Sequence, residues 1–85
     1  MDNETSLYQN RRKFEILLYG ITKRTVKQIM ELNSWDEDRA LTEFAKSEVY
    51  SFLENEESKV WHYSPLMLAI LFNDEKNGNL VFPET

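Results

Sequence analysis

Residues 59–75 read KVWHYSPLMLAILFNDE and include the longest apolar run of the chain, residues 66–72. Ser64 is a preferred N-cap residue, and Pro65 suits the first helical position because its missing N–H would have no partner there. A segment that is apolar on every side is typical of a helix buried in a core. The stretch therefore predicts a helix that begins at Ser64 and Pro65 and is the most buried element of the protein.

The residues on either side fit such a helix. Trp61 and Tyr63 precede the cap, where large side chains can pack against the first turn. Gly78 follows the polar end of the run and favours a left-handed terminator. The apolar residues 80–82 then predict an extended tail, residues 79–85, that docks on the core or on a partner.

Composition supports an all-α fold. The chain has 85 residues, 41% of them apolar, which is enough for one small domain over residues 1–85. Two glycines and two prolines are few for a sheet-rich domain. We therefore expect a compact bundle of three to five short helices. The absence of cysteine excludes disulfides, thiol catalysis and iron–sulfur clusters and fits a reducing compartment.

The polar N-terminus bears on location. Residues 1–13 contain no hydrophobic secretory region, and no apolar run approaches the length of a membrane span. We expect a cytoplasmic protein with no membrane contact, whose residues 1–6 are frayed.

Two apolar stripes at helical spacing cover residues 14–30, the second rotated by about 120° from the first. Their members are Phe14, Leu17, Leu18 and Ile21, and then Val26, Ile29 and Met30. Gly20 is unfavourable inside a helix, and Thr25 with Gln28 has the spacing of a capping box. We expect a kink or a break between Gly20 and Thr25. The alternative is a single long helix that contacts two neighbours.

The next helix start is signalled at residues 34–38. Ser34 can cap, Glu37 can reach back to it, and the acids Asp36 and Asp38 suit the positive end of a helix dipole. The expected buried face comprises Ala40, Leu41, Phe44 and Ala45, extended by Val49, Phe52 and Leu53. Either Ser47 begins a new helix, or the first one runs on to about Leu53.

Charge is distributed unevenly along the chain. Residues 1–30 carry six bases and three acids, a net charge of +3, whereas residues 31–85 carry four bases and twelve acids, a net charge of −8. This asymmetry fits internal complementarity, a self-complementary dimer, or two faces for two partners.

Catalytic and metal-binding signals are weak. His62 is the only histidine, and the nearby acids Glu54, Glu56 and Glu57 lack the ExxH or HxxxH spacing of a metal site. Ser64 is better explained as a cap than as a nucleophile, and two isolated glycines cannot build a phosphate loop. We predict no enzyme activity, no cofactor, no metal and no small-molecule substrate.

The bases raise the question of nucleic acid. They are Arg11, Arg12, Lys13, Lys23, Arg24 and Lys27. Residues 25–46 have the length of a helix-turn-helix, but its recognition helix would begin with the acids at residues 36–38, which phosphates repel. We therefore do not expect nucleic acid as a partner and interpret the bases as a solvated helix face.

The acids allow another hypothesis. Carboxylates spread over a small helical body can imitate nucleic acid and occupy the basic cleft of another protein. A net charge of −5 is moderate for such a mimic, so an ordinary acidic surface is favoured. An acidic inhibitor of this kind is the alternative function.

Tyrosine and tryptophan are numerous for so small a core. They are either half-buried residues at the core edge or exposed anchors of an interface, and both interpretations stay open. The candidate partner-binding residues are Trp35, Tyr50, Trp61 and Tyr63. The leading hypothesis is a non-catalytic interaction protein that presents this aromatic-acidic surface to a protein partner or to a second copy.

A motif of packing residues runs through residues 40–75. It consists of Phe-x-x-Ser-x-x-Tyr-x-x-Leu, an acidic turn, Lys-x-Trp and a Ser-led helix. The positions are Phe44, Ser47, Tyr50, Leu53, Lys59, Trp61 and Ser64. The motif resembles a pattern in a family of small, uncharacterised bacterial helical proteins, a domain of unknown function. The resemblance covers less than half of the chain. It implies an accessory partner encoded beside other genes, sometimes of the toxin–antitoxin kind, and it implies no activity.

Overall fold

The fold is all-helical. The computed structural model describes residues 3–58 and 60–79, with side chains from Arg12 onward. Four α-helices, α1 to α4, are separated in part by two short 3-10 helices, η1 and η2. Their bounds are α1 Asn3–Asn33, α2 Glu37–Ala45, α3 Glu48–Glu54, η1 Glu56–Ser58, η2 Val60–His62 and α4 Pro65–Lys76. The predicted all-α bundle is confirmed.

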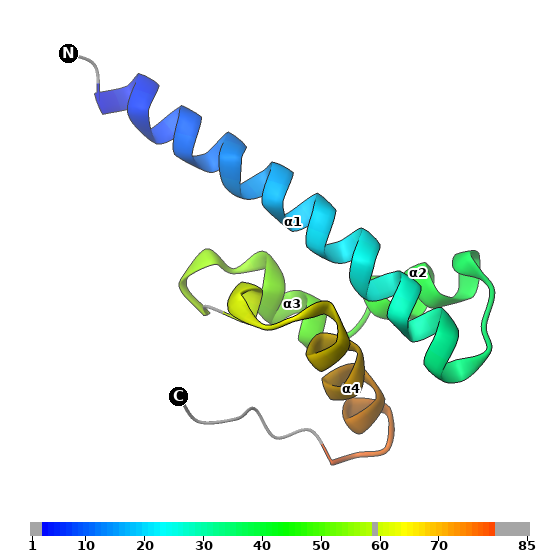
Figure 1. Ribbon diagram of the computed structural model, residues 1–85. Coiled ribbons are helices and arrows are strands. Elements are labelled where there is room, and N and C mark those ends of the chain that lie inside the picture. The colour runs from blue at the N-terminus through cyan, green and yellow to red at the C-terminus, as the bar shows by residue number, and fades with distance from the viewer. Residues whose placement is uncertain (1–2, 59, 80–85) are drawn as a thin grey trace.

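Helix α1 dominates the shape (Figure 1). Its 31 residues, at about 1.5 Å each, account for nearly all of the long dimension of a 50 × 29 × 19 Å molecule. Helices α2, α3 and α4 gather around its C-terminal half, and its N-terminal part extends beyond them. The expected break between Gly20 and Thr25 is wrong, because α1 runs through both residues.

The rotation between the two apolar stripes of α1 has a simple cause. Phe14, in the first stripe, packs edge-to-face against Trp61 of η2 at 6.2 Å between ring centroids. Val26, in the second stripe, instead lines a groove beside Glu37 and Leu41 of α2. A continuous helix that contacts two neighbours on different sides needs two stripes, so the alternative of a single long helix is confirmed.

Replacement of Gly20 by alanine is expected to stabilise the protein by about 0.5–1 kcal/mol, because glycine is unfavourable inside a helix. An added Cβ would meet only the flexible end of the Arg24 side chain, at 3.3 Å. Urea denaturation of Gly20→Ala against the wild type measures the change. A destabilised variant would indicate that the backbone at Gly20 is not regular helix.

Helix α4 begins and ends as predicted. Ser64 accepts a hydrogen bond from the Met67 amide at 3.1 Å, and Pro65 is the first helical residue. Gly78 has a φ of 78°, and the Asn79 amide donates to the Asp74 carbonyl at 2.7 Å. This is the pattern of a Schellman terminator, which favours glycine at the left-handed position.

Burial of α4 differs from the expectation. Leu68, Ala69, Leu71 and Phe72 are buried on the side that faces α1 and α3, as predicted. The opposite side, however, leaves Leu66 47%, Met67 37% and Ile70 41% exposed. The helix therefore packs into the core from one side only, although its sequence is apolar on every side.

The turn between α1 and α2 also corrects a prediction. Ser34 is not the N-cap; it adopts a left-handed φ of 56° and closes α1, and the Trp35 amide donates back to the Met30 carbonyl. Asp36 caps α2 instead, accepting from the Arg39 amide at 2.8 Å. Because the chain must reverse direction first, α2 begins after Asp36 rather than after Ser34.

A second helix start separates α2 from α3. The Ser47 hydroxyl accepts from the Tyr50 amide at 3.1 Å and donates to the Phe44 carbonyl at 2.6 Å. The open question about Ser47 is therefore answered in favour of a new helix. Part of the expected buried face is exposed: Leu41, Ala45 and Phe52.

One hydrophobic core joins all four helices. Its buried members are Ile21, Val26, Ile29, Ala40, Phe44, Val49, Leu53, Val60, Leu68, Ala69, Leu71 and Phe72. Phe72 and Phe44 are in edge contact at 6.0 Å between ring centroids, which links α4 to α2.

Two predictions concern the chain ends. The apolar residues 80–82 of the expected tail lie outside the described residues, as do residues 1–2. Helix α1 begins at Asn3. The fraying of residues 1–6 stays a prediction.

Candidate interaction surface

Trp35 and Tyr50, two of the four candidate residues, lie at the edge of the core. Both are half-buried and pack against it. Trp35 contacts Phe72 edge-to-face at 6.1 Å, and the Arg39 guanidinium lies 4.2 Å from the Trp35 ring centroid. Tyr50 contacts Phe44 at 5.4 Å. Their rings therefore complete the packing of two buried phenylalanines.

Trp61 and Tyr63 are also half-buried against the core. Trp61 packs on Phe14 of α1, stacks on His62 at 4.0 Å and donates from Nε1 to the Glu56 carbonyl at 2.9 Å. These contacts tie η1 and η2 to α1. The structure thus places Trp35 and Tyr50 on the Phe44–Phe72 pair and Trp61 on α1, rather than bringing the candidates into one site. Binding of a partner by the four residues stays a prediction.

His62 is exposed and stacked on Trp61. Glu54, Glu56 and Glu57 are exposed as well. Within residues 3–58 and 60–79, no group of three or more histidine, aspartate or glutamate side chains could hold a metal ion.

Several acids are engaged inside the fold. The Glu75 carboxylate accepts hydrogen bonds from the amides of Glu48 and Val49 at 2.9 and 3.0 Å, at the start of α3. Glu43 lies 2.6 Å from the Lys76 ammonium, and this hydrogen bond and charge lower the pKa of the Glu43 carboxyl. Asp36 caps α2. These carboxylates already have partners within the chain.

Tyr50 faces α1. Burial raises the pKa of its hydroxyl, the Glu54 carboxylate raises it further, and the nearby Thr22 hydroxyl acts in the opposite direction. Thr22 Oγ1 and Thr25 Oγ1 are nevertheless buried without a hydrogen bond of normal geometry among the described residues. Tyr50 remains a neutral phenol at neutral pH.

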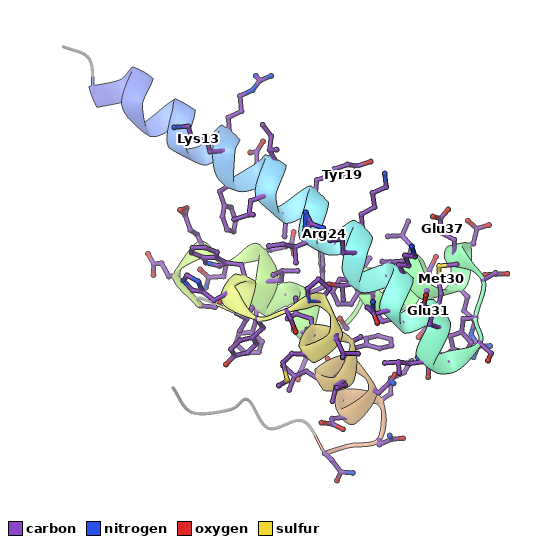
Figure 2. The ribbon with its side chains drawn as sticks, viewed as in Figure 1. Lys13, Tyr19, Arg24, Met30, Glu31 and Glu37 are labelled. Carbon is purple, nitrogen blue, oxygen red and sulfur yellow. The ribbon has the colours of Figure 1, made fainter. Side chains whose placement is uncertain are left out.

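A surface that the sequence analysis missed lies on α1. We call it the open face and define it by eight exposed residues: Arg12, Lys13, Ile16, Leu17, Tyr19, Lys23, Arg24 and Lys27. Ile16 is 65% and Tyr19 68% exposed, although both are large apolar side chains. Figure 2 shows Tyr19 pointing away from α3 and α4.

The open face carries five bases, Arg12, Lys13, Lys23, Arg24 and Lys27. Among the described residues, none of its five bases forms a salt bridge, although Lys23 Nζ lies 5.9 Å from the Tyr19 ring centroid. Glu15 is the only exposed acid among residues 12–27. The interpretation of these bases as a solvated helix face is consistent with their exposure, but that interpretation overlooked Ile16 and Tyr19 among them.

A groove between α1 and α2 borders the open face. It has a volume of about 200 Å³ and is lined by Tyr19, Thr22, Lys23, Val26, Glu37 and Leu41. Lys23 and Glu37 place one charge of each sign beside the apolar side chains of Val26 and Leu41. Figure 2 labels Tyr19 and Glu37, which come from the two helices that form it. The groove can take one apolar side chain of a partner.

Comparison of the chain with protein-family models, with curated proteins and with solved structures gave no match. The family resemblance of residues 40–75 therefore stays a prediction. Within the described part of the chain, no helix combines the length and the apolar character that a membrane crossing needs.

Proposed function

We propose that this protein is a small, non-catalytic, cytoplasmic interaction protein that binds an acidic protein surface through the open face of α1. The observation that carries the proposal is the exposure of Ile16 and Tyr19, 65% and 68%, among bases that have no salt-bridge partner in the described chain. Exposed apolar side chains ringed by charge are typical of interaction sites.

The open face supports this role better than Trp35 and Tyr50 do. Those two rings pack on Phe72 and Phe44, so removing them would disturb the core as well as any interface. Trp61 differs, because it packs on Phe14 of α1 rather than on Phe44 or Phe72. Its Nε1 also donates a hydrogen bond to the Glu56 carbonyl, which holds the acidic turn beside it. One part of the aromatic-acidic surface, Trp61 with Glu56 and Glu57, therefore borders one edge of the open face and belongs to the proposal.

Capture of partners from an extract of the native host tests the proposal. Tagged wild-type protein is expected to retain a specific protein, and Ile16→Asp with Tyr19→Asp is expected to lose it at least tenfold. Ile70→Asp is the matched control, since Ile70 is 41% exposed on α4, away from α1. Equal capture by both variants would overturn the open face as the binding surface.

The acidic-inhibitor alternative is weaker. It needs free carboxylates, whereas Asp36, Glu43 and Glu75 serve as a helix cap, a salt bridge and a second helix cap. The exposed acids that remain are spread over α1, α2, α3 and η1. This leaves fewer groups to imitate a phosphate backbone than the count of acids suggests.

A further inference from the structure

We propose that the acidic partner of the open face is a second copy of this chain. The inference rests on the proposed function and names the partner. It starts from charge complementarity: the open face carries five bases without salt bridges among the described residues, and Glu54, Glu56 and Glu57 form an exposed acidic cluster without salt bridges there. The chain thus presents both halves of an ion-pairing surface.

The two charged groups lie on adjoining elements. Phe14 follows Lys13 on α1 and contacts Trp61 at 6.2 Å, and Trp61 Nε1 donates to the Glu56 carbonyl at 2.9 Å. This pair of contacts holds the acidic turn on the Phe14 side of α1, about 100° around the helix from Lys13. The acidic turn therefore borders one edge of the open face, the edge that carries Lys13, Leu17 and Arg24.

Such a surface suits a two-fold dimer. In a two-fold interface the same patch meets itself, so each patch must carry its own complement. A purely basic patch would repel its copy. With the acidic cluster beside it, a rotation by 180° lays the bases of each copy against the acids of the other.

The apolar residues of the open face also fit a dimer interface. Ile16 and Leu17 are 65% and 41% exposed between the charged groups and supply the apolar centre that interfaces need. A standard interface covers about 800 Å² on each partner, which is about an eighth of the 6306 Å² surface of this chain. The N-terminal part of α1, which extends beyond the body, adds length to this contact.

The length of α1 is a further reason to expect a second copy. Helices without tertiary packing are marginally stable in water. Among the elements that the structure describes, no helix lies beside the part of α1 that extends past α2, α3 and α4 (Figure 1). A second copy packed along α1 would supply one.

Nucleic acid fits the same bases less well. The acidic turn adjoining α1 would face the phosphates, and the chain as a whole carries a net charge of −5. A protein partner that brings both signs of charge avoids this repulsion.

Sedimentation velocity on the purified full chain, from 5 to 200 μM and at 50 and 500 mM salt, tests the proposal. The wild type is expected to form dimers at low salt whose dissociation constant rises at least tenfold at high salt, because exposed ion pairs are screened. Two charge-reversed proteins sharpen the test: Lys13→Glu with Arg24→Glu, and Glu56→Lys with Glu57→Lys. Each alone is expected to be monomeric, and an equimolar mixture is expected to form heterodimers. All four positions are exposed, and circular dichroism confirms that the variants fold.

The outcomes separate the two proposals. A wild type that stays monomeric at 200 μM and low salt overturns the second copy as partner. If such a monomer still captures a host protein through Ile16 and Tyr19, the proposed function survives; if it captures none, both proposals fail.

A dimer that persists in both reversed proteins, or that is lost in Ile70→Asp but not in Ile16→Asp, places the contact elsewhere and overturns the inference. Binding of a 20-base-pair DNA or RNA duplex by the monomer, lost in Lys13→Glu with Arg24→Glu, also overturns it in favour of nucleic acid.

Discussion

Phe72→Ala is expected to lower the free energy of unfolding by about 3–5 kcal/mol, the largest effect of any single substitution considered for this chain. Phe72 is 1% exposed and contacts Trp35 at 6.1 Å and Phe44 at 6.0 Å between ring centroids. Truncation removes the ring that joins α4 to α2 and leaves a cavity that neighbouring aromatic rings cannot easily fill.

The expected loss is comparable to the whole stability of many small domains, about 5–15 kcal/mol. Phe72→Leu, which keeps most of the volume, provides a milder variant that still folds. The control is Ile70→Ala on the same helix, where 41% exposure limits the expected loss to about 1 kcal/mol. Urea denaturation followed by circular dichroism measures all three. Equal losses at Phe72 and Ile70 would mean that α4 presents a different side to the core.

Local signals predicted the ends of α4 from sequence. A serine before a proline and a glycine after the last polar turn act through backbone groups within a few residues, and both act here as expected. The buried side of α4 was not predictable in the same way. Seven consecutive apolar residues have no periodicity, so only the positions of α1 and α3 decide that Leu68 is buried and Ile70 is not.

Tertiary contacts overrode the local signals in α1. Gly20 and the Thr25–Gln28 spacing each favour an interruption, but packing against α4 and η2 on one side and α2 on the other keeps the helix continuous. The same reasoning explains Ser34. A capping residue is recognised by its type, whereas its place in the turn depends on how sharply the chain must reverse between two packed helices.

The candidate surface shows a similar limit. The number of tryptophans and tyrosines drew attention to Trp35 and Tyr50, yet a sequence does not tell which rings have aromatic partners in the core. Ile16 and Tyr19 are exposed because α2, α3 and α4 cover other sides of α1. In the sequence, only one feature indicated this exposed side of α1: Arg12, Ile16 and Lys23 recur at helical spacing outside both apolar stripes.

The second large effect on stability is expected at Glu75, whose carboxylate on α4 caps the start of α3. Glu75→Ala is expected to destabilise the protein by about 1–2 kcal/mol, because Glu75 accepts from the amides of Glu48 and Val49, 27 and 26 residues earlier. With Ser47 bound to the Tyr50 amide, the first three amides of α3 all have partners. Helix α3 has seven residues, too few to be stable without such contacts.

The size of the Glu75 effect depends on which amides lose their partner. Glu48 is exposed and water can replace the lost bond, whereas Val49 is buried and its amide would be left without an acceptor. Glu75→Gln keeps one carbonyl oxygen and should lose about half as much stability.

Asp74→Ala is the matched control, since it removes the same charge one residue earlier and keeps the Asp74 carbonyl that binds the Asn79 amide. Urea denaturation gives the stabilities, and amide exchange should quicken at Val49 in Glu75→Ala alone. If Asp74→Ala costs as much, net charge rather than the cap stabilises α3. If exchange at Val49 is unchanged, α3 is held by its packing on α4 and does not need the carboxylate.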